Sequence, residues 1–347
     1  MKSKKFNFYN SNLNLNNKTV LITGGTGSFG QSFVKKVLKT YNPKRLIIFS
    51  RDEHKQNIMA NKFKEFSDCL RFFIGDVRDR DRLILAANDV DYIVHSAALK
   101  HVPTAEYNPF ECIRTNVIGA ENIIYAAINC NVEKTIALST DKAANPVNIY
   151  GASKLASDKI FIAGNHLAAN SKSRFSVVRY GNVIGSRGSL YWILKDIIEK
   201  KIKKVPVTDK RMTRFWITLE QGVEFVLSSL NEMRGGEIYI PKIPSMKIVD
   251  FINSLCPNEK KIEIGIRPGE KLHETMITKD DSRYTYECKD RYIIEPNIHA
   301  WDPVRKKNKK IDGIKVKEDF EYSSDNNKDW LKETELKSLL VSLEKEY

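Results

Sequence analysis

Short apolar runs alternate with longer helical patterns between Thr19 and Arg179. The apolar runs predict β-strands at Thr19–Thr23, Arg45–Phe49, Arg71–Ile74, Tyr92–His95, Lys134–Ser139 and Phe175–Arg179. The segments between them predict helices, among them Gln31–Lys39, Glu53–Phe66 and Phe110–Ile128. Strand–helix–strand units of this length build a parallel sheet, and all-apolar strands indicate helices on both of its faces. We therefore predict a doubly wound α/β fold.

The pattern changes after Asn182, where shorter pieces with more glycine and proline follow. This change predicts a sheet domain at 17–182, completed by later segments, and a smaller lobe mainly at 183–298. Residues 1–16 are expected to form a loose polar tail with a short adhesive patch and without the apolar region of a secretory signal. An extension at 299–347 is expected to end in a helix from Asp329, its N-cap, through Leu343.

Composition and charge exclude several classes of protein. The chain has 347 residues, of which 41% are hydrophobic, and no apolar run reaches the ~18 residues of a membrane span. The net charge is +14, but lysine and arginine are scattered, and the densest run, at 305–310, is expected to be a solvated loop. We therefore expect neither nucleic acid nor membrane as a partner, and a positive surface suited to a polyanionic small substrate.

The cysteines and histidines argue against metal and disulfide chemistry. The five cysteines are far apart without a C-x-x-C pair, and the six histidines lack metal-binding spacing. We therefore expect no metal site, no disulfide framework and a reducing cytoplasm.

A glycine-rich turn follows the first predicted strand. Gly24, Gly27 and Gly30 form a G-x-x-G-x-x-G pattern, which brings backbone N–H groups and a helix N-terminus to a pyrophosphate. An ordinary strand–helix turn is the alternative, but the position at the first strand of a βαβ series favours a dinucleotide. The predicted Rossmann-type cofactor site also includes Thr26, Ser28, Phe29, Asp76, Val77, Ala97, Lys100, Tyr150 and Lys154.

The tip of the second predicted strand bears on the choice of cofactor. Ser50 and Arg51 offer a hydroxyl and a guanidinium suited to a ribose 2′-phosphate. We therefore predict NADP over NAD. Asp52, which could hold a 2′-hydroxyl, keeps NAD as the alternative, and Lys55 is included in this part of the site.

Proton-transfer chemistry gathers at the end of the fifth predicted strand. Ser139-Thr140-Asp141-Lys142 ends that strand, and Tyr150 and Lys154 follow on one face of a predicted helix. A cationic lysine beside a tyrosine favours the phenolate, which lets Tyr150 act as a base near neutral pH. The same spacing recurs at Tyr191 and Lys195, which we assign to a structural helix because no such polar strand end precedes them.

Taken together, the glycine pattern, the Tyr-Lys pair and the polar strand end resemble the extended short-chain dehydrogenase/reductase family. The Thr140-Asp141-Lys142 loop is similar to that of its configuration-inverting UDP-N-acetylglucosamine 4,6-dehydratases, whereas retaining dehydratases carry Thr-Asp-Glu there. The resemblance extends from about Asn17 to Glu295 and resumes near Asp319. Further matching strings are Ala98-Leu-Lys-His-Val-Pro103, Arg179-Tyr-Gly-Asn-Val-Ile-Gly-Ser-Arg-Gly188, Arg211-Met-Thr-Arg-Phe-Trp-Ile217 and Arg267-Pro-Gly-Glu-Lys271.

The resemblance implies NADP-dependent dehydration of UDP-N-acetylglucosamine at C4 and C6 with inversion at C5. The product would be UDP-2-acetamido-2,6-dideoxy-beta-L-arabino-hex-4-ulose, made in the first step of pseudaminic acid biosynthesis for surface or flagellin glycosylation. Tyr150 would take the 4-hydroxyl proton and Thr140 would hold the 4-oxygen. Neutral Lys142 would take the C5 proton, and protonated Asp141 would donate to the departing 6-hydroxyl. Burial and nearby Lys154 are expected to lower the pKa of Lys142 from about 10.4.

The resemblance also implies the substrate contacts and the assembly. The guanidinium groups of arginine bind phosphates through two parallel hydrogen bonds, and the phosphate candidates are Arg187, Arg211 and Arg267. Contacts with the sugar are expected from Asn182 and Lys100. Contacts with the uracil or ribose are expected from Thr208, Met212 and Glu270. A homo-oligomer, a hexamer in this family, is expected.

Other functions stay open at the level of the sequence. One is a UDP-sugar epimerase or a bifunctional dehydratase/epimerase, and another is a non-catalytic Rossmann protein. A simple epimerase does not need the Asp141–Lys142 pair, and a binding protein does not need all four proton-transfer groups.

Overall fold

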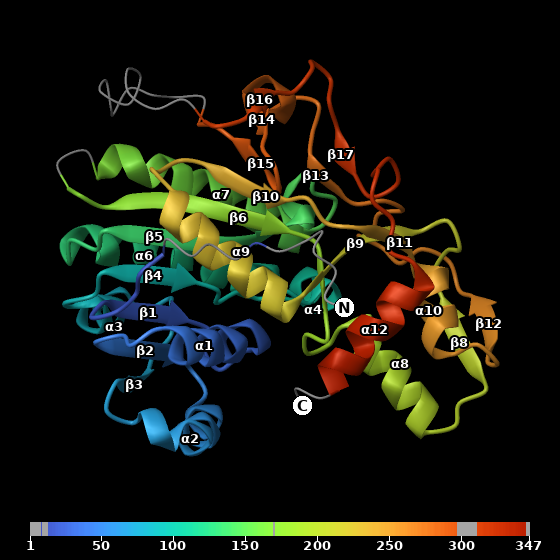
Figure 1. The fold of residues 1–347 in the computed structure, drawn as a ribbon, viewed down its shortest axis with the longest axis horizontal. Coiled ribbons are helices and arrows are strands. Elements are labelled where there is room, and N and C mark those ends of the chain that lie inside the picture. The colour runs from blue at the N-terminus through green and yellow to red at the C-terminus, as the bar shows by residue number, and fades with distance from the viewer. Residues whose placement is uncertain (1–7, 9–12, 169–170, 297–310, 345–347) are drawn as a thin grey trace.

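The computed structural model describes residues 8, 13–168, 171–296 and 311–344, so the basic run at 305–310 lies outside the described residues. A long twisted sheet forms the centre of this part of the chain, with strand order β16-β14-β15-β10-β6-β5-β4-β1-β2-β3 (Figure 1). Its strands are β1 Thr19–Thr23, β2 Arg45–Ser50, β3 Leu70–Ile74, β4 Tyr92–His95, β5 Lys134–Thr140, β6 Arg174–Tyr180, β10 Ile238–Pro241, β14 Thr285–Glu287, β15 Arg291–Ile294 and β16 Ile314–Lys315.

The strands from β3 to β10 pair in parallel, and β15, β14 and β16 add antiparallel pairs at one edge. The order reverses between β1 and β4, which are neighbours although β2 and β3 separate them in the chain. Such a switch point opens a crevice at the carboxyl ends of the strands, where ligands bind in doubly wound folds. The predicted fold class is confirmed.

Helices cover both faces of this sheet, as its buried strands require. Helices α1 (Ser28–Thr40) and α9 (Leu219–Glu232) pack against each other on one face, and α3 (Arg80–Ala87), α6 (Gly119–Asn129) and α7 (Ile149–Leu167) lie on the other (Figure 1). Phe33, Val34 and Val37 form the buried stripe of α1. Three further helices, α2 Glu53–Lys62, α4 Val102–Tyr107 and α5 Pro109–Ile113, lie in the connections.

A smaller lobe has its own hydrophobic cluster, which includes Tyr191, Trp216, Phe251 and Leu336. Figure 1 shows α8, α10 and α12 grouped in this lobe beside the edge of the sheet domain. Its helices are α8 Leu190–Glu199, α10 Ile248–Leu255 and α12 Glu333–Glu344, and its short strands are β7 Asn182–Ile184, β8 Lys204–Val207, β9 Thr213–Thr218, β11 Ser245–Lys247 and β12 Lys260–Glu263. Two further strands, β13 Thr275–Ile277 and β17 Tyr322–Ser323, pair with each other and bury Met276, Ile277 and Tyr322 in the core of the sheet domain.

The last helix begins later than predicted, and Asp329 is not its N-cap. The backbone before it forms a bridge to β11 instead, since Ser245 N donates to Asp329 O and Leu331 N donates to Ser245 O. These backbone bonds hold the segment extended, so α12 starts at Glu333.

Two predicted helices are interrupted. The helix predicted at Glu53–Phe66 ends at Lys62 and is followed by a 3₁₀ turn at Lys64–Phe66. The helix predicted at Phe110–Ile128 runs from Pro109 to Asn129 and contains a π-helical turn at Arg114–Ile118. Hydrophobic periodicity does not register either change of winding.

The described part of the N-terminal segment packs on the sheet domain rather than lying loose. Leu15 is fully buried, and the Phe8 ring meets the edge of Phe225 on α9 at 4.9 Å between ring centroids. Among the described residues, no helix is long and apolar enough to cross a membrane.

Candidate functional site

The glycine turn between β1 and α1 forms one end of a cavity of about 1040 Å³. Gly24 has a φ of +65°, and a Cβ there would lie 3.0 Å from the backbone of Ala97. The chain can therefore approach β4 only with glycine at this position. Gly27 is the N-cap of α1 and no side chain caps the helix, which leaves its first N–H groups available to an anion. This cradle fits the pyrophosphate of a dinucleotide.

All of the predicted cofactor residues line this cavity. They are Gly24, Thr26, Gly27, Ser28, Phe29, Gly30, Ser50, Arg51, Asp52, Lys55, Asp76, Val77, Ala97, Lys100, Tyr150 and Lys154. The cavity thus extends from the carboxyl end of β2 across β1 and β4 to β5, as expected for an extended ligand at the switch point.

At the carboxyl end of β2 the guanidinium of Arg51 is exposed, whereas the carboxylate of Asp52 is engaged by α2. Arg51 is 55% exposed, with its Nη1 3.5 Å from Asp76 Oδ2. Asp52 caps α2 by accepting from Lys55 N and also pairs with Lys55 Nζ, contacts that lower the pKa of Asp52. The Ser50 Oγ accepts from Gln56 Nε2, so its own O–H remains available to donate.

The carboxyl end of β5 carries the predicted acid–base groups. Thr140 Oγ1 accepts from Lys142 N and starts a 3₁₀ turn at Asp141–Ala143. The turn directs the fully buried Asp141 and the partly exposed Lys142 to the cavity, which both of them line. The Thr140 hydroxyl donates to Asp141 Oδ1 at 3.0 Å.

Helix α7 brings Tyr150 and Lys154 to the same place. Asn148 caps the helix by accepting from Gly151 N. The side chains of Tyr150 and Lys154 are nine-tenths or more buried and line the cavity. Helix α7 also packs directly against the Asp141–Ala143 turn. The structure therefore assembles Thr140, Asp141, Lys142, Tyr150 and Lys154 in one place, as the sequence predicted.

The expected low pKa of Lys142 is wrong for this structure. Burial by itself lowers that pKa, but two carboxylates outweigh it and raise the pKa above its ordinary value. Lys142 Nζ lies 3.0 Å from both Asp141 Oδ1 and Glu274 Oε1. The prediction failed because Glu274, more than a hundred residues away in the sequence, was not foreseen at this position.

The expected phenolate character of Tyr150 is also not seen. Burial raises the pKa of Tyr150 to about 12, against the opposing effects of Lys142 and a hydrogen bond with Thr140. Burial lowers the pKa of Lys154 despite the carboxyl of Asp158. Desolvation is therefore the largest influence on the pKa of both groups.

Sequence reasoning missed two buried carboxyl groups of the site. Glu274 lies behind Lys142, and Asp158 lies one helical turn after Lys154, where it accepts from Ser139 Oγ at 2.8 Å and Arg179 Nη2 at 3.3 Å. The position four residues after Lys154 on one helix was a signal for Asp158. Nothing in the local sequence marks Glu274.

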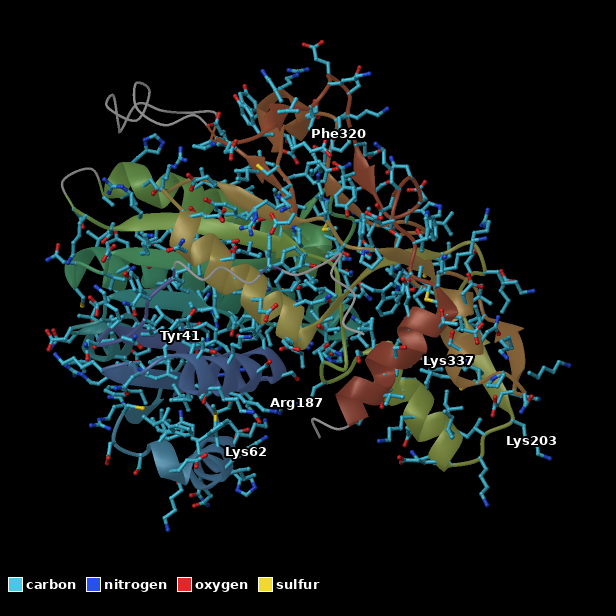
Figure 2. The ribbon with its side chains drawn as sticks, in the orientation of Figure 1. Tyr41, Lys62, Arg187, Lys203, Phe320 and Lys337 are labelled. Carbon is cyan, nitrogen blue, oxygen red and sulfur yellow. The ribbon has the colours of Figure 1, made fainter. Side chains whose placement is uncertain are left out.

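Five of the predicted substrate residues line the cavity, namely Lys100, Asn182, Arg187, Arg267 and Glu270. Arg187 contacts the glycine turn twice, since its Nη2 donates to Thr26 O and its backbone N donates to Ser28 Oγ. Figure 2 shows Arg187 between α1 and the lobe that carries α8 and α12. Arg267 pairs with Glu270, and Lys100 Nζ donates to Arg187 O.

The structure does not bring the other three predicted substrate residues to this cavity. Arg211 is 72% exposed and pairs with Asp209 at 2.8 Å. Met212 is buried, and its Sδ accepts from Thr208 Oγ1 and Arg214 Nη2. These contacts keep Thr208, Arg211 and Met212 in the β8–β9 connection, outside the cavity lining.

Comparisons with known proteins identify the family of this chain. The profile of a family described as "Polysaccharide biosynthesis protein" matches residues 20–296. A UDP-N-acetylglucosamine 4,6-dehydratase (inverting) of Campylobacter jejuni is 56% identical over 330 residues, 94% of this chain and 98% of that protein.

Solved structures show the same fold. The structure of Pen from Bacillus thuringiensis matches with a TM-score of 0.86 at 35% identity, covering 95% of this chain and 99% of that one. DesIV, a dTDP-glucose 4,6-dehydratase from Streptomyces venezuelae with NAD and TYD bound, matches with a TM-score of 0.65 at 22% identity over 73% of this chain and 86% of its own.

Proposed function

This chain belongs to the polysaccharide biosynthesis protein family, and we propose on that premise that it is an inverting UDP-N-acetylglucosamine 4,6-dehydratase. The observation that carries the proposal is the Asp141–Lys142 pair beside Tyr150 in the cavity that the glycine turn enters. The product would be a 6-deoxy-4-ketosugar with inverted C5, which opens the route to pseudaminic acid.

The chemistry follows from the acidity of the sugar hydrogens. The hydrogen on C5 is not acidic until C4 is a ketone, so oxidation at C4 must come first. A nicotinamide dinucleotide, which the glycine turn at Gly24 and Gly27 would hold, would supply this oxidation through hydride transfer from C4 and back to C6. Tyr150 takes the 4-hydroxyl proton, and the Thr140 hydroxyl holds the 4-oxygen.

Elimination then needs one base and one acid on the sugar. Lys142 takes the C5 proton, and Asp141 gives a proton to the departing 6-hydroxyl, which leaves as water. C5 is then reprotonated from the opposite face by a proton from solvent, and the 4-hydroxyl proton taken by Tyr150 is returned to solvent. Asp141 has no exposure to solvent, which limits exchange of its proton with bulk water during these steps.

The lobe and the loop after β6 are proposed to bind the UDP part of the substrate. Arg187 and Arg267 offer guanidinium forks to the diphosphate, with Asn182, Lys100 and Glu270 beside them in the lining. Arg211 remains a proposed diphosphate contact, and Thr208 and Met212 remain proposed contacts of the uracil or ribose. A movement of the β8–β9 connection would have to bring all three to the substrate.

We propose that the dinucleotide is NADP. The exposed guanidinium of Arg51 and the free O–H of Ser50 suit a 2′-phosphate, while Asp52 is engaged at the start of α2. Arg51→Ala should weaken NADP binding by about tenfold or more and leave NAD binding nearly unchanged, because a charged hydrogen bond contributes about 1.5–3 kcal/mol. Fluorescence titration with both cofactors measures this, and equal losses would contradict NADP as the cofactor.

The reaction itself is tested by NMR. The purified protein is incubated with UDP-N-acetylglucosamine in heavy water without added reductant. The expected product has a 6-methyl group, a 4-keto group and deuterium at an inverted C5. A 4-epimer that retains its 6-hydroxyl would instead establish an epimerase, and both products together a bifunctional enzyme.

We further propose a domain division at 17–182, 183–298 and 299–347, a cytoplasmic location and a homo-oligomer, with a hexamer suggested by the family resemblance. The five unpaired cysteines support a reducing compartment. Light scattering of the purified protein tests the assembly.

A further inference from the structure

Glu274 lies directly behind Lys142, and no step of the proposed reaction uses it. Its side chain is 2% exposed, and its Oε1 lies 3.0 Å from Lys142 Nζ. The same nitrogen lies 3.0 Å from Asp141 Oδ1. Lys142 is therefore held between a carboxyl group that reaches the cavity and another that does not line it.

The backbone of Glu274 is fixed from the C-terminal part of the chain. Glu274 N donates to Ser324 Oγ at 2.9 Å, and Ser324 N donates to Glu274 O at 2.8 Å. Ser324 is fully buried and follows β17, which pairs with β13 directly after Glu274. A side chain on such a support holds its partner at a defined place.

Charges from several elements surround the pair. Arg214 Nε of β9 lies 3.6 Å from Glu274 Oε1, and Lys271 Nζ lies 4.0 Å from Glu274 Oε2. From α7, the Tyr150 phenol also interacts with Lys142. Three cations thus face the carboxyl groups of Asp141 and Glu274. An uncompensated charge at this depth would be strongly destabilising.

We propose that Glu274 is the positioning residue of the Asp141–Lys142 pair, holding the lysine nitrogen against Asp141 so that a proton passes between the two. This inference rests on the proposed function. The Lys142 ammonium gives one proton to the Asp141 carboxylate, which leaves an amine and a carboxylic acid without exchange with solvent. The amine then takes the C5 proton, and the acid protonates the departing 6-hydroxyl. Water leaves, and the original ion pair is restored.

The negative charge of Glu274 decides where the proton goes. A carboxylate at 3.0 Å stabilises the ammonium form, so Lys142 does not lose its proton to water over the working pH range. The proton moves only to Asp141, where the elimination needs it. One internal transfer therefore prepares the base and the acid together.

The test measures the rate of dehydration of UDP-N-acetylglucosamine as a function of pH, with hydrogen or deuterium at C5 of the substrate. The isotope effect of C5 deuterium isolates the step in which Lys142 removes the C5 proton from hydride transfer at C4. Glu274→Gln keeps the shape of the side chain and removes its charge. In the wild type the rate falls at alkaline pH, where Lys142 loses its proton. We expect this fall to occur about 1–3 pH units lower in Glu274→Gln, because loss of a neighbouring negative charge lowers the pKa of Lys142.

Glu274→Asp and a matched variant separate positioning from stability. The aspartate keeps the charge but withdraws it by one methylene, so its rate of dehydration should fall by about fivefold or more with the wild-type pH profile. Glu237→Gln removes a carboxylate that is equally buried but lies at β10 and binds Ser176 Oγ. It should lower the melting temperature without displacing the alkaline fall.

Several outcomes overturn the inference. A wild-type pH profile for Glu274→Gln would do so, as would the same profile change in Glu237→Gln. A wild-type rate for Glu274→Asp would also do so. If Glu274→Gln does not fold, the rate of Glu274→Asp alone decides. Absence of dehydration by the wild type would overturn the proposed function and the role of Glu274 with it, whereas failure of the variants alone leaves the proposed function standing.

Discussion

At the scale of single residues, burial sets the protonation of groups around the cavity. His95 at the end of β4 shows this in its simplest form. Its side chain is 1% exposed, its Nδ1 lies 2.8 Å from Thr23 Oγ1, and its Nε2 has no hydrogen-bond partner among the described residues. Burial, with a smaller contribution from Lys154, lowers the pKa of His95 to about 3.

This low pKa predicts a specific dependence of stability on pH. The folded pKa lies below the ordinary value of 6.5, so the unfolded chain binds the proton first. The contribution of neutral His95 is present in full above pH 6.5 and is lost as the pH falls toward 3, at about 1.4 kcal/mol per pH unit. Between pH 7 and 5 the wild type should lose about 2 kcal/mol more of its free energy of unfolding than His95→Gln. Urea unfolding at both pH values measures the difference, and equal losses would contradict the prediction.

At the scale of elements, the contact between α7 and the Asp141–Ala143 turn positions the reactive groups. Gly151 makes this contact possible, because a Cβ on it would lie 2.3 Å from Lys142 O. A backbone oxygen cannot turn aside as a flexible side chain can. The helix and the turn would have to separate, and Tyr150 would move away from Lys142.

Gly151→Ala is therefore expected to lower both activity and stability. Separation of α7 from the turn should reduce kcat by about a hundredfold, the size of effect that a displacement of about 1 Å produces, at a stability cost of about 1–3 kcal/mol. Gly222→Ala on α9 is the control, because a Cβ there meets its nearest atom, Tyr180 Cζ, at 4.0 Å. The control should stay active and gain up to about 1 kcal/mol. Kinetics and urea unfolding measure both variants, and a fully active Gly151→Ala would contradict this role of the glycine.

The predictable parts of the molecule are those that the local sequence encodes. The strand at Tyr92–His95 and the gathering of Thr140, Lys142 and Tyr150 follow from apolar runs and from the ends of neighbouring parallel strands. The position of Glu274 depends on the pairing of β13 with β17, a long-range contact without a local pattern. The pKa of Lys142 could not be predicted for the same reason, since it depends on a partner that only the tertiary structure supplies.

At the scale of the whole molecule, the cavity lies between two bodies with separate hydrophobic cores. The glycine turn and the ends of β2, β4 and β5 come from the sheet domain. Ile193 of α8 and Arg267 come from the side of the lobe. The lobe core also includes α12, far from α8 in the sequence but beside it in space (Figure 1). Binding of the cofactor is thus expected to depend on the core of the sheet domain, and binding of the UDP-sugar on the core of the lobe.

Leu336→Ala tests this division. Leu336 of α12 is fully buried in the lobe core, and its truncation should cost about 2–5 kcal/mol. We expect the KM for UDP-N-acetylglucosamine to rise and the Kd for NADP to stay unchanged, because the loosened core supports α8 and not the glycine turn. Val341→Ala, on the same helix and 54% exposed, should change neither value. Steady-state kinetics and fluorescence titration measure the two constants. An equal weakening of both would mean that the molecule responds as one cooperative unit, and that the lobe does not govern the substrate end of the cavity separately.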